Sequence, residues 1–516
     1  MADTGFFPLA AADPDRAAVL DPAGTALTAG HLAGRAHRLA HGLRSLGLEY
    51  GDTVAVVLPN GAPFLELYLA ALESGLYFTP INHHLVGAEI AYIAADSDAK
   101  VLVGHERFAA EVGKAVVELG AAAPPMFAVG AIEGFRPYAE LSDGQPDTPP
   151  PDRRSGLAMH YTSGTTGQPK GVKRTLPALE ADDFGALIGL FLTLFGIQPN
   201  DGNIHLTCSP LYHTAVLMFT GCSLQLGHQV VVMDKWSPEG MLEQIERHGV
   251  TTSHMVPTQF HRLLALPEDV RSRYDVSSLR AMVHAAAPCP PEIKRRMIDW
   301  WGDAIVEYYA ATEGGGTVVF AKDWLEKPGT VGRAWPTSEV RILDDDGNQL
   351  GAGDIGTVYM SLASADFEYK GDKEKTESSR RDGFFTVGDI GYLDEDGYLF
   401  LCDRKSDMII SGGVNIYPAE IESAFLTHPK IADVAVFGIP HEDWGEEIKA
   451  VVEPAPGVEP GDELAAELLA FAAGKLAKYK LPRSVDFIVE MPRDPNGKLY
   501  KRRLRDPFWE GRERAI

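Results

Sequence analysis

The sequence predicts an α/β protein with two domains. Apolar strand-like runs alternate with amphipathic helical stretches through most of the chain, and short strands separated by Asp-Gly turns follow Gly329. Alternating strands and helices predict parallel sheets covered by helices, and Asp-Gly pairs predict antiparallel hairpins. We therefore expect a large N-terminal domain, residues 1–403, of mainly parallel sheets covered by helices plus an antiparallel β subdomain, and a small α+β C-terminal domain, residues 404–516.

The N-terminal elements follow from hydrophobic periodicity. Residues 27–47 repeat apolar side chains at helical spacing and end on glycine, which predicts a helix. Later elements are expected as strands at 52–60, 77–82 and 100–104 and helices at 62–75 and 86–98. A loop rich in proline leads to a strand at 156–162, beyond whose carboxyl end α/β sheets place ligands.

The same alternation continues to the end of the chain. Strands with their following loops are expected at 202–215, 229–233, 250–257 and 279–288, with a helix at 238–249. The antiparallel part comprises 340–350, 353–360 and 391–401. In the C-terminal domain we expect helices at 417–429 and 461–477 and strands at 431–440, 449–455 and 484–490.

Composition excludes several classes of protein. The 516 residues carry a net charge of −25, and the only basic cluster is "KLYKRRLR", so nucleic acid is not an expected partner. Four scattered cysteines support neither a zinc site nor a disulfide framework. Neither a signal peptide nor a membrane span is expected, and the expected location is the cytoplasm.

The run "YTSGTTGQPKG", Tyr161 to Gly171, carries the strongest chemical indication. Glycines let successive backbone N–H groups converge on one anion, and hydroxyls and an ammonium add donors. This chemistry suits a polyphosphate. The run is not a P-loop, because proline precedes its lysine and glycine follows it.

This run resembles the phosphate loop of the adenylate-forming, or AMP-binding, superfamily, in particular its acyl-CoA synthetase and fatty-acid–CoA ligase branch. The resemblance implies ATP, Mg²⁺ and coenzyme A as cofactors and co-substrates. It also implies that Thr166 is catalytic and that the loop binds the nucleotide's phosphates through Thr162, Ser163, Gly164, Thr165, Thr166, Gly167 and Lys170.

Two further motifs resemble the family's acyl-binding segments. "SPLYHTA" places His213 in the acyl pocket, and no aspartate follows it to hold an α-ammonium, so an α-amino acid is a poor substrate candidate. "VHAAAPC" resembles the small-residue segment beside adenine and the acyl group. The implied substrate residues are His213, Val216, His284, Ala285, Tyr308 and Ala310, and the implied adenine residues are Ala286, Ala287 and Pro288.

"EYYAATEGGG" resembles the adenine and magnesium motif. It implies that Glu307, Tyr308, Tyr309 and Thr312 bind the nucleotide and that Glu313 is catalytic as the ligand of Mg²⁺. A hard carboxylate oxygen suits that ion. Tyr308 and Ala310 replace glycines that are frequent in the family, which leaves the shape of the acyl pocket open.

The C-terminal motifs complete the resemblance. "TVGDIGYLDEDG" implies Asp389 as the ribose ligand, and "DRKSDMIISGGVNIYPAEIE" implies Arg404 as a ribose or phosphate ligand. A hinge is expected near Ser406, which makes the C-terminal domain mobile, with Gly412 and Gly413 near the pantetheine arm. "RDPNGKLYKR" implies Lys498 as the catalytic lysine of adenylation.

The implied function is an ATP-dependent acyl-CoA ligase acting on a fatty, aryl or bulky alicyclic acid. A stand-alone enzyme that loads a carrier protein remains open, as do a luciferase-like oxygenase and a non-catalytic ATP-binding regulator. A peptide-synthetase module is disfavoured, because no carrier domain follows Lys498. The oligomeric state, a homodimer included, stays open.

Overall fold

The computed structural model describes residues 4–162, 169–362, 367–493, 497 and 499–510. Contacts within the chain divide it into two compact units, each assembled from separate segments. Unit 1 comprises residues 1–254, 269–282 and 364–378, and unit 2 comprises 255–268, 283–363 and 379–516.

Unit 1 contains a six-stranded parallel sheet near the N-terminus, with the strand order β7-β6-β5-β3-β4-β8. Its strands are β3 (Thr53–Val57), β4 (Tyr77–Pro80), β5 (Ala99–His105), β6 (Met126–Val129), β7 (Arg136–Pro137) and β8 (Leu157–Ala158). The first helices of the unit are α1 (Phe6–Ala12), α2 (Ala29–Ser45), α3 (Ala62–Glu73), α4 (Gly87–Asp96) and α5 (Ala109–Leu119). These elements confirm the predicted alternation.

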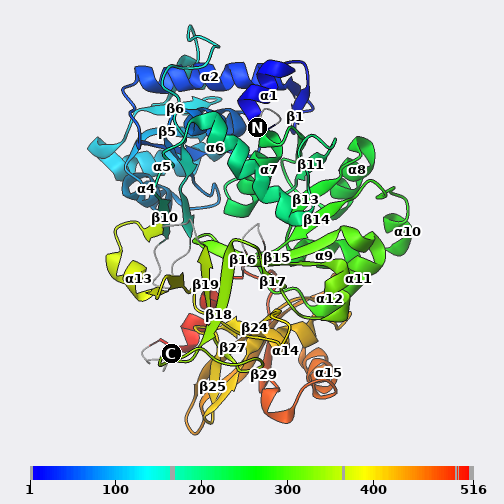
Figure 1. The fold of residues 1–516 in the computed structure, drawn as a ribbon. Coiled ribbons are helices and arrows are strands. Elements are labelled where there is room, and N and C mark those ends of the chain that lie inside the picture. The colour runs from blue at the N-terminus through cyan, green and yellow to red at the C-terminus, as the bar shows by residue number, and fades with distance from the viewer. Residues whose placement is uncertain (1–3, 163–168, 363–366, 494–496, 498, 511–516) are drawn as a thin grey trace. The chain divides into compact units, whose positions relative to one another are not determined.

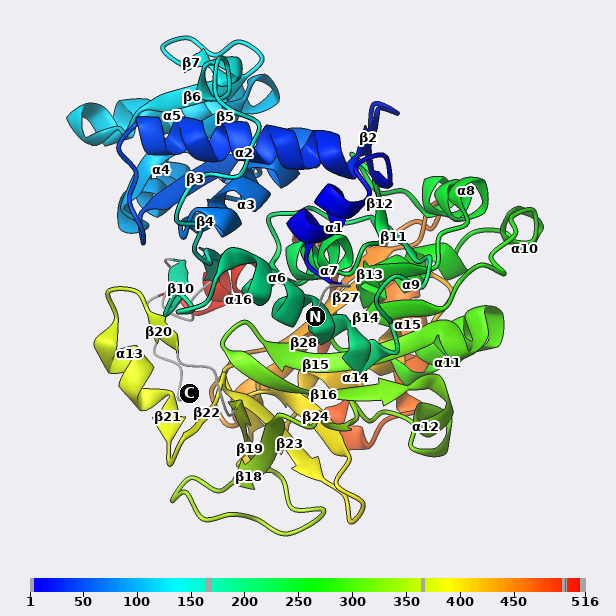
Figure 2. The same cartoon turned by 45° about the horizontal axis from the view of Figure 1, so that its top comes forward.

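Helices cover both faces of this sheet (Figures 1 and 2). Val54 and Val56 of β3 pack with α2 and α3, whereas Ala55 and Val57 pack with α4 and α5. All four strand residues are fully buried. Both faces are therefore apolar, which explains why the strand reads as a continuous apolar run instead of an alternating one.

A second group of strands in unit 1 has the order β2-β1-β12-β11-β13, with parallel pairs except between β1 and β2. The strands are β1 (Ala17–Leu20), β2 (Ala26–Thr28), β11 (Ile204–Thr207), β12 (Gln229–Val232) and β13 (Thr252–Met255). The accompanying helices are α6 (Ala181–Gly189), α7 (Thr214–Gln225) and α8 (Pro238–His248). Helix α8 begins after Ser237, which accepts a hydrogen bond from Gly240 N, and ends at Gly249 in the left-handed conformation.

The predicted strand at 156–162 is divided in the structure. Residues 157–158 form β8, parallel to β4, whereas β9 (His160–Thr162) pairs antiparallel with β10 (Lys170–Arg174). A third strand, β20 (Phe367–Tyr369), joins the other edge of β10 and is followed by α13 (Lys373–Ser378). Residues 157–162 therefore contribute to two sheets: β8 joins the six-stranded parallel sheet, and β9 joins the sheet that contains β10.

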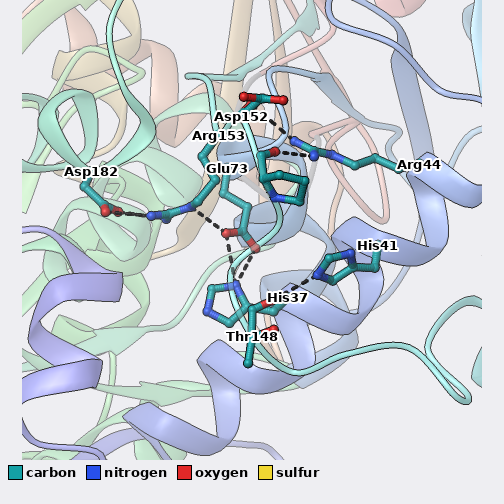
Figure 3. A network of polar contacts seen from close by, with 9 residues as sticks. His37, His41, Arg44, Glu73, Thr148, Asp152, Arg153 and Asp182 are labelled. Atoms are coloured by element: carbon teal, nitrogen blue, oxygen red, sulfur yellow. Dashed lines mark hydrogen bonds and ion pairs between the residues drawn. The ribbon is translucent and has the colours of Figure 1, made fainter.

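A buried polar network holds the segment before this strand (Figure 3). The carboxylate of Glu73, which is completely buried, lies 2.9 Å from His37 Nδ1 and 2.9 Å from Arg153 Nε. The guanidinium of Arg153 also donates two hydrogen bonds of 2.6 and 2.7 Å to Asp182. Charge-assisted bonds of this kind compensate for the burial of the charges. They connect residue 153 to α2, α3 and α6.

Unit 2 contains two groups of antiparallel strands in its first part. One has the order β15-β16-β17 and consists of β15 (Ile305–Ala311), β16 (Gly314–Phe320) and β17 (Arg333–Ala334). The other consists of β18 (Ser338–Leu343), β19 (Gly356–Leu362), β21 (Arg380–Arg381), β22 (Phe384–Phe385), β23 (Asp389–Leu393) and β24 (Leu399–Arg404). The predicted antiparallel β subdomain is confirmed. Helices α9 (Pro257–Leu264), α11 (Pro291–Trp301) and α12 (Ala321–Glu326) also belong to unit 2.

The last part of unit 2 has its own sheet and core. The strands are β25 (Ile409–Ser411), β26 (Val414–Ile416), β27 (Ile431–His441), β28 (Gly445–Pro454) and β29 (Ser484–Phe487), with β29 parallel to β28 and the other pairs antiparallel. Helices α14 (Pro418–Phe425) and α15 (Asp462–Ala473) share its apolar cluster, and α16 (Lys501–Arg505) follows. This arrangement confirms the predicted α+β character. In the described part of the chain, no helix is both long and apolar enough to cross a bilayer.

Candidate active site

In unit 1, Lys170 lies at the start of the strand that returns from the glycine-rich run. It pairs across the hairpin with Thr162, and its Nζ lies 3.5 Å from Asp372 Oδ2. The hairpin is further fixed by Tyr161, whose hydroxyl donates a 2.6 Å hydrogen bond to Asp96. The ammonium of Lys170 is thus paired with an acidic residue from a distant segment of the chain.

His213 and Val216 lie at the beginning of α7. Val216 is buried, and the ring of His213 lies 4.4 Å from the ring of Tyr212. Burial lowers the pKa of His213 to about 3, and neighbouring histidines add to this effect, so the ring is neutral. Among the described residues, its buried Nε2 has no hydrogen-bond partner. Such an atom is available to a ligand.

A cavity of about 340 Å³ lies elsewhere in unit 1. It is lined by Asp21, Pro22, Ala23, residues 58–63, His105, Arg107 and Asp234. These residues lie at or just after the carboxyl ends of β1, β3, β5 and β12, and Arg107 is paired with Asp234 at 2.6 Å. Of the predicted site residues that the structure describes, none lines this cavity.

In unit 2, the nucleotide residues predicted from two separate motifs meet. Tyr309 on β15 donates a 2.6 Å hydrogen bond from its hydroxyl to Asp389 Oδ2 on β23. Arg404 is paired in register with Asp389 across the β23–β24 hairpin, and its Nε lies 3.3 Å from Oδ1. Burial raises the pKa of the Tyr309 hydroxyl, and Asp389 raises it further, so the hydroxyl stays a donor.

Glu313 occupies the bend between β15 and β16. Its side chain is buried, and its charge contributes to raising the pKa of Tyr309. Among the described residues, no three His, Cys, Asp or Glu side chains converge to hold a metal ion. A single carboxylate fits an Mg²⁺ ion that takes its other ligands from phosphates and water.

Glu307 and Tyr308, on the same strand, are both buried, and burial raises the pKa of each side chain. The carboxylate of Glu307 forms a hydrogen-bonded ion pair with Lys294 Nζ of α11. The same Oε2 atom lies 4.0 Å from Nε2 of His284, at the end of β14 (Ala281–His284). Residues predicted to bind nucleotide and acid therefore meet around one buried carboxylate.

The small-residue segment follows His284. Ala285 is buried, Ala287 is half-buried, and Ala286 and Pro288 are exposed. Ala286 has φ 74°, a left-handed conformation that is unusual for a residue with a Cβ. Ala310 and Thr312, on and just after β15, are half-buried.

The predicted hinge and coenzyme A residues lie at exposed turns. Ser406 follows β24, and its backbone oxygen accepts a 3.3 Å hydrogen bond from Arg505. Gly412 and Gly413 form the turn between β25 and β26 with φ 58° and 80°, as a tight hairpin requires. Ser163, Gly164, Thr165, Thr166, Gly167 and Lys498 lie outside the described residues.

Sequence reasoning missed two lysine contacts. Asp372 is distant in sequence from Lys170, and no local pattern indicates their pairing. The sequence does indicate that Lys294 has a buried partner, because Lys294 lies with Ile293 and Met297 on the buried side of an amphipathic helix. A lysine at such a position needs an anion.

Two family models match the chain. The AMP-binding enzyme family matches residues 6–364, and the AMP-binding enzyme C-terminal domain matches residues 420–498. Together they include the motifs at Lys170, Tyr309 and, at the end of the second range, Lys498.

Several characterised proteins are similar over nearly the full chain. Feruloyl-CoA synthase of an Amycolatopsis species is 36% identical over 493 residues, covering 94% of each chain. The fatty acid–acyl-carrier-protein ligase ScoC of Streptomyces coeruleorubidus is 32% identical, covering 96% of this chain and 94% of that one. The structure of ATP-bound MatB from Rhodopseudomonas palustris has a TM-score of 0.82 at 29% identity, covering 98% of this chain and 99% of that one.

Proposed function

The chain belongs to the AMP-binding enzyme family, and from this premise we propose that it is an AMP-forming acid–thiol ligase. In the first half-reaction, a carboxylate attacks the α-phosphorus of ATP, and acyl-AMP and pyrophosphate result. In the second, the thiol of coenzyme A displaces AMP and yields an acyl-CoA. The observation that carries the proposal is the contact of Tyr309 and Arg404 with Asp389.

Asp389 is the proposed ribose ligand. Its oxygens are oriented by Tyr309 and Arg404, and each carboxylate oxygen has a second lone pair with which to accept a ribose hydroxyl. The proposed adenine contacts come from Tyr309 and from residues 286–288. The remaining proposed nucleotide ligands are Thr312 and, at the phosphates, Thr162 and Lys170 with the residues of the loop.

Catalysis of nucleotidyl transfer consists of alignment and neutralisation of charge. Glu313 fits as the protein ligand of Mg²⁺, which would supply positive charge at the pyrophosphate. Lys170 and Thr166 are proposed to bind the leaving pyrophosphate, and Lys498 to hold the carboxylate against the α-phosphate. The pairing of Lys170 with Asp372 keeps its ammonium in place until the more highly charged phosphates replace that partner.

We propose a domain boundary between residues 403 and 404 and a hinge near Ser406. The separate sheet and apolar cluster of residues 409–472 support an independently moving C-terminal domain. Gly412 and Gly413, exposed at a hairpin turn, are the proposed backbone approach to pantetheine. The proposed location of the reaction is the cytoplasm.

The proposed acid is fatty, aryl or bulky alicyclic. The neutral ring of His213, the buried Val216 and the buried Tyr308 favour an apolar acyl group with one polar contact. The relatives named as a feruloyl-CoA synthase and as a fatty acid–acyl-carrier-protein ligase agree with this range. Thr214, Ala215 and Val216 offer no anion for an α-ammonium.

A carrier protein is a second candidate acceptor. One relative is named as an acyl-carrier-protein ligase, and its match covers 96% of this chain, which keeps this alternative open beside coenzyme A. Its first half-reaction is the same, and only the thiol differs.

The test measures pyrophosphate release with ATP and Mg²⁺ over a panel of fatty, cinnamate-like, benzoate-like, steroid and amino acids, with and without coenzyme A. Release that depends on the acid, with AMP and an acyl-CoA product, supports the ligase. Acid-dependent release without a thioester supports the carrier acceptor or an oxygenase. Nucleotide binding without acid-dependent release from any member of the panel supports the non-catalytic regulator.

The proposed role of Lys498 is tested separately. Lys498→Ala should abolish acid-dependent pyrophosphate release while largely sparing thioester formation from supplied acyl-AMP. An equal loss of both half-reactions would contradict this role.

A further inference from the structure

The acid that pairs with Lys170 in unit 1 also caps the start of a helix. Oδ1 of Asp372 accepts a 3.0 Å hydrogen bond from Lys375 N in the first turn of α13, whereas Oδ2 lies 3.5 Å from Lys170 Nζ. Figure 2 shows β10, β20 and α13 next to one another. Asp372 therefore uses one oxygen for its own helix and the other for the lysine of the glycine-rich run.

The contact between Asp372 and Lys170 is the weaker of the two. Its length of 3.5 Å exceeds the usual length of an N–H···O hydrogen bond. The side chains of Lys170 and Asp372 are 21% and 24% exposed, so water reaches both groups. When the contact opens, Asp372 keeps the Lys375 N–H and neither charge is left buried. An anion can therefore replace Asp372 at the ammonium at a small cost in free energy.

The backbone of Lys170 is held independently of this ion pair. Lys170 is paired in the β9–β10 hairpin, and the carbonyl of Gly171 accepts a 2.9 Å hydrogen bond from Lys370 N. Residues 163–169 carry no charged side chain, and in the described part of the chain Asp372 is the acid paired with this ammonium. Removing the charge of Asp372 should therefore change the electrostatics of the ammonium and leave the hairpin in place.

We propose that Asp372 is a positioning residue that competes with phosphates for the ammonium of Lys170 and thereby weakens the binding of pyrophosphate. The inference rests on the proposed function, in which Lys170 binds the leaving pyrophosphate. The phosphates must displace the carboxylate before they contact the ammonium, and this exchange lowers the net free energy of binding. Pyrophosphate therefore leaves more readily after acyl-AMP has formed.

Asp372→Asn tests the proposal, because asparagine also caps helices and the substitution removes only the charge. The dissociation constant for magnesium pyrophosphate, measured by calorimetry, should fall by about two- to fivefold, the range that corresponds to one partly exposed ion pair. The inhibition constant of pyrophosphate against adenylation should fall by the same factor. An unchanged or weaker affinity for pyrophosphate would overturn the proposal.

A double variant separates competition for the ammonium from a structural role of Asp372. In a Lys170→Met background, Asp372→Asn should change the affinity by less than about twofold, because the group for which the carboxylate competes is absent. A full gain in that background would overturn the proposal. Asp372→Ser supplies a second neutral cap if Asp372→Asn folds poorly, and it should give the same gain.

The matched control is Asp98→Asn. Oδ2 of Asp98 lies 2.8 Å from Nζ of Lys370, so the variant removes one negative charge beside the same hairpin without removing the partner of Lys170. Asparagine tolerates the left-handed φ of 54° at this position. Affinity for pyrophosphate should change by less than about twofold. A gain equal to that of Asp372→Asn would mean that net charge alone is responsible, and it would overturn the proposal.

The same titrations distinguish the inference from the proposed function. If Lys170→Met binds pyrophosphate as tightly as the wild type, the proposed role of Lys170 is wrong and the inference is wrong with it. If Lys170→Met loses affinity and Asp372→Asn gains none, Lys170 keeps its role and the inference alone is overturned. Tighter binding in Asp372→Asn that disappears in the Lys170→Met background supports both.

Discussion

Two buried glutamates, Glu73 in unit 1 and Glu307 in unit 2, have the same types of neighbour and different arrangements. Each carboxylate faces one histidine and one permanently basic residue. At Glu73, the histidine and Arg153 both make hydrogen bonds (Figure 3). At Glu307, Lys294 donates the hydrogen bond, and Nε2 of His284 lies 4.0 Å from the Oε2 atom of the carboxylate.

The difference lies in what each network connects. Arg153 spans two carboxylates, those of Glu73 and Asp182, and its guanidinium also lies 4.6 Å from the ring of Phe7. This network ties a connecting segment to several helices. The network at Glu307 instead joins residues proposed to bind acid and nucleotide. The same types of buried charge can therefore secure chain segments, as at Glu73, or lie among residues proposed to bind ligands, as at Glu307.

The largest expected effect is a loss of stability of unit 1 at acidic pH. Burial lowers the pKa of His160, His205 and His254 to about 3, well below 6.5. The unfolded chain therefore binds protons from pH 6.5 downward while the folded chain does not, and stability falls as pH falls. Between pH 6.5 and pH 3, each histidine lowers the free energy of unfolding by about 1.4 kcal/mol for each pH unit, so the three together lower it by about 4 kcal/mol per pH unit.

Hydrogen exchange between pH 7.5 and 5.5 measures this effect locally. After correction for the intrinsic, base-catalysed rate of amide exchange, the free energy of opening in β11 and β13 should fall on acidification, and His205→Gln should remove about one third of this fall if the variant is folded at pH 7.5. If exchange in the wild type and in His205→Gln depended equally on pH, burial of the neutral His205 would not be a cause of the acid sensitivity.

The next largest effect tests the role of Glu73 in holding unit 1. Glu73→Ala leaves two basic groups without their buried partner and should destabilise the protein by about 3–5 kcal/mol, as measured by urea unfolding. The folded fraction should keep its kcat, because the network does not include predicted site residues. Glu140→Ala, at an exposed pair with Arg136, is the matched control. If Glu73→Ala lowered kcat and left the free energy of unfolding unchanged, Glu73 would act in the reaction and not in holding unit 1 together.

A smaller effect is expected at the nucleotide site. Asp389→Asn keeps the shape of the side chain but removes the charge that Tyr309 and Arg404 contact. Hydrogen bonds to charged groups contribute about 1.5–3 kcal/mol, so affinity for ATP should fall by about 10- to 150-fold in calorimetric titration. Tyr309→Phe should cause a smaller loss, since it removes one donor to the carboxylate. Undiminished ATP affinity in Asp389→Asn would refute the ribose assignment.

The smallest effect sets a baseline for surface charges. Arg38 pairs with Asp147 at 2.8 Å, and both side chains are about half exposed, at 44% and 58%. Arg38→Ala should therefore change the free energy of unfolding by less than about 1 kcal/mol. A loss comparable with that of Glu73→Ala would show that the segment before residue 153 depends on its exposed contacts instead of the buried network.

The sequence predicted those parts of the fold that depend on local periodicity. The helix expected at 86–98 is α4 (Gly87–Asp96), and the hairpin expected around Asp396 and Gly397 joins β23 to β24. The strand expected at 156–162 was wrong as a single strand, because its halves pair with β4 and β10. Pairing partners are chosen by tertiary contacts, which no local pattern records.

For the site residues, too, the sequence predicted what local motifs encode, and it did not predict contacts between distant segments. Motif order located Tyr309 and Asp389 in separate stretches, and the structure joins them by a hydrogen bond across 80 positions of sequence. The pairing of Lys170 with Asp372 and of Glu307 with Lys294 depends on the fold, so motifs alone did not identify the partners. The sequence indicated the chemistry of the groups, and the structure provided their partners.

The return of β20 to the edge of β10 has a consequence for how the protein is made. Lys370 N donates a 2.9 Å hydrogen bond to Gly171 O, and the three paired positions join residues 172–174 to residues 367–369. During synthesis, the ribosome must therefore complete almost two hundred further residues before the edge of β10 receives this partner. A chain cut at residue 364, where the first family match ends, would expose that edge to pairing between molecules. A boundary beyond residue 378 is the better choice for any shortened version of the enzyme.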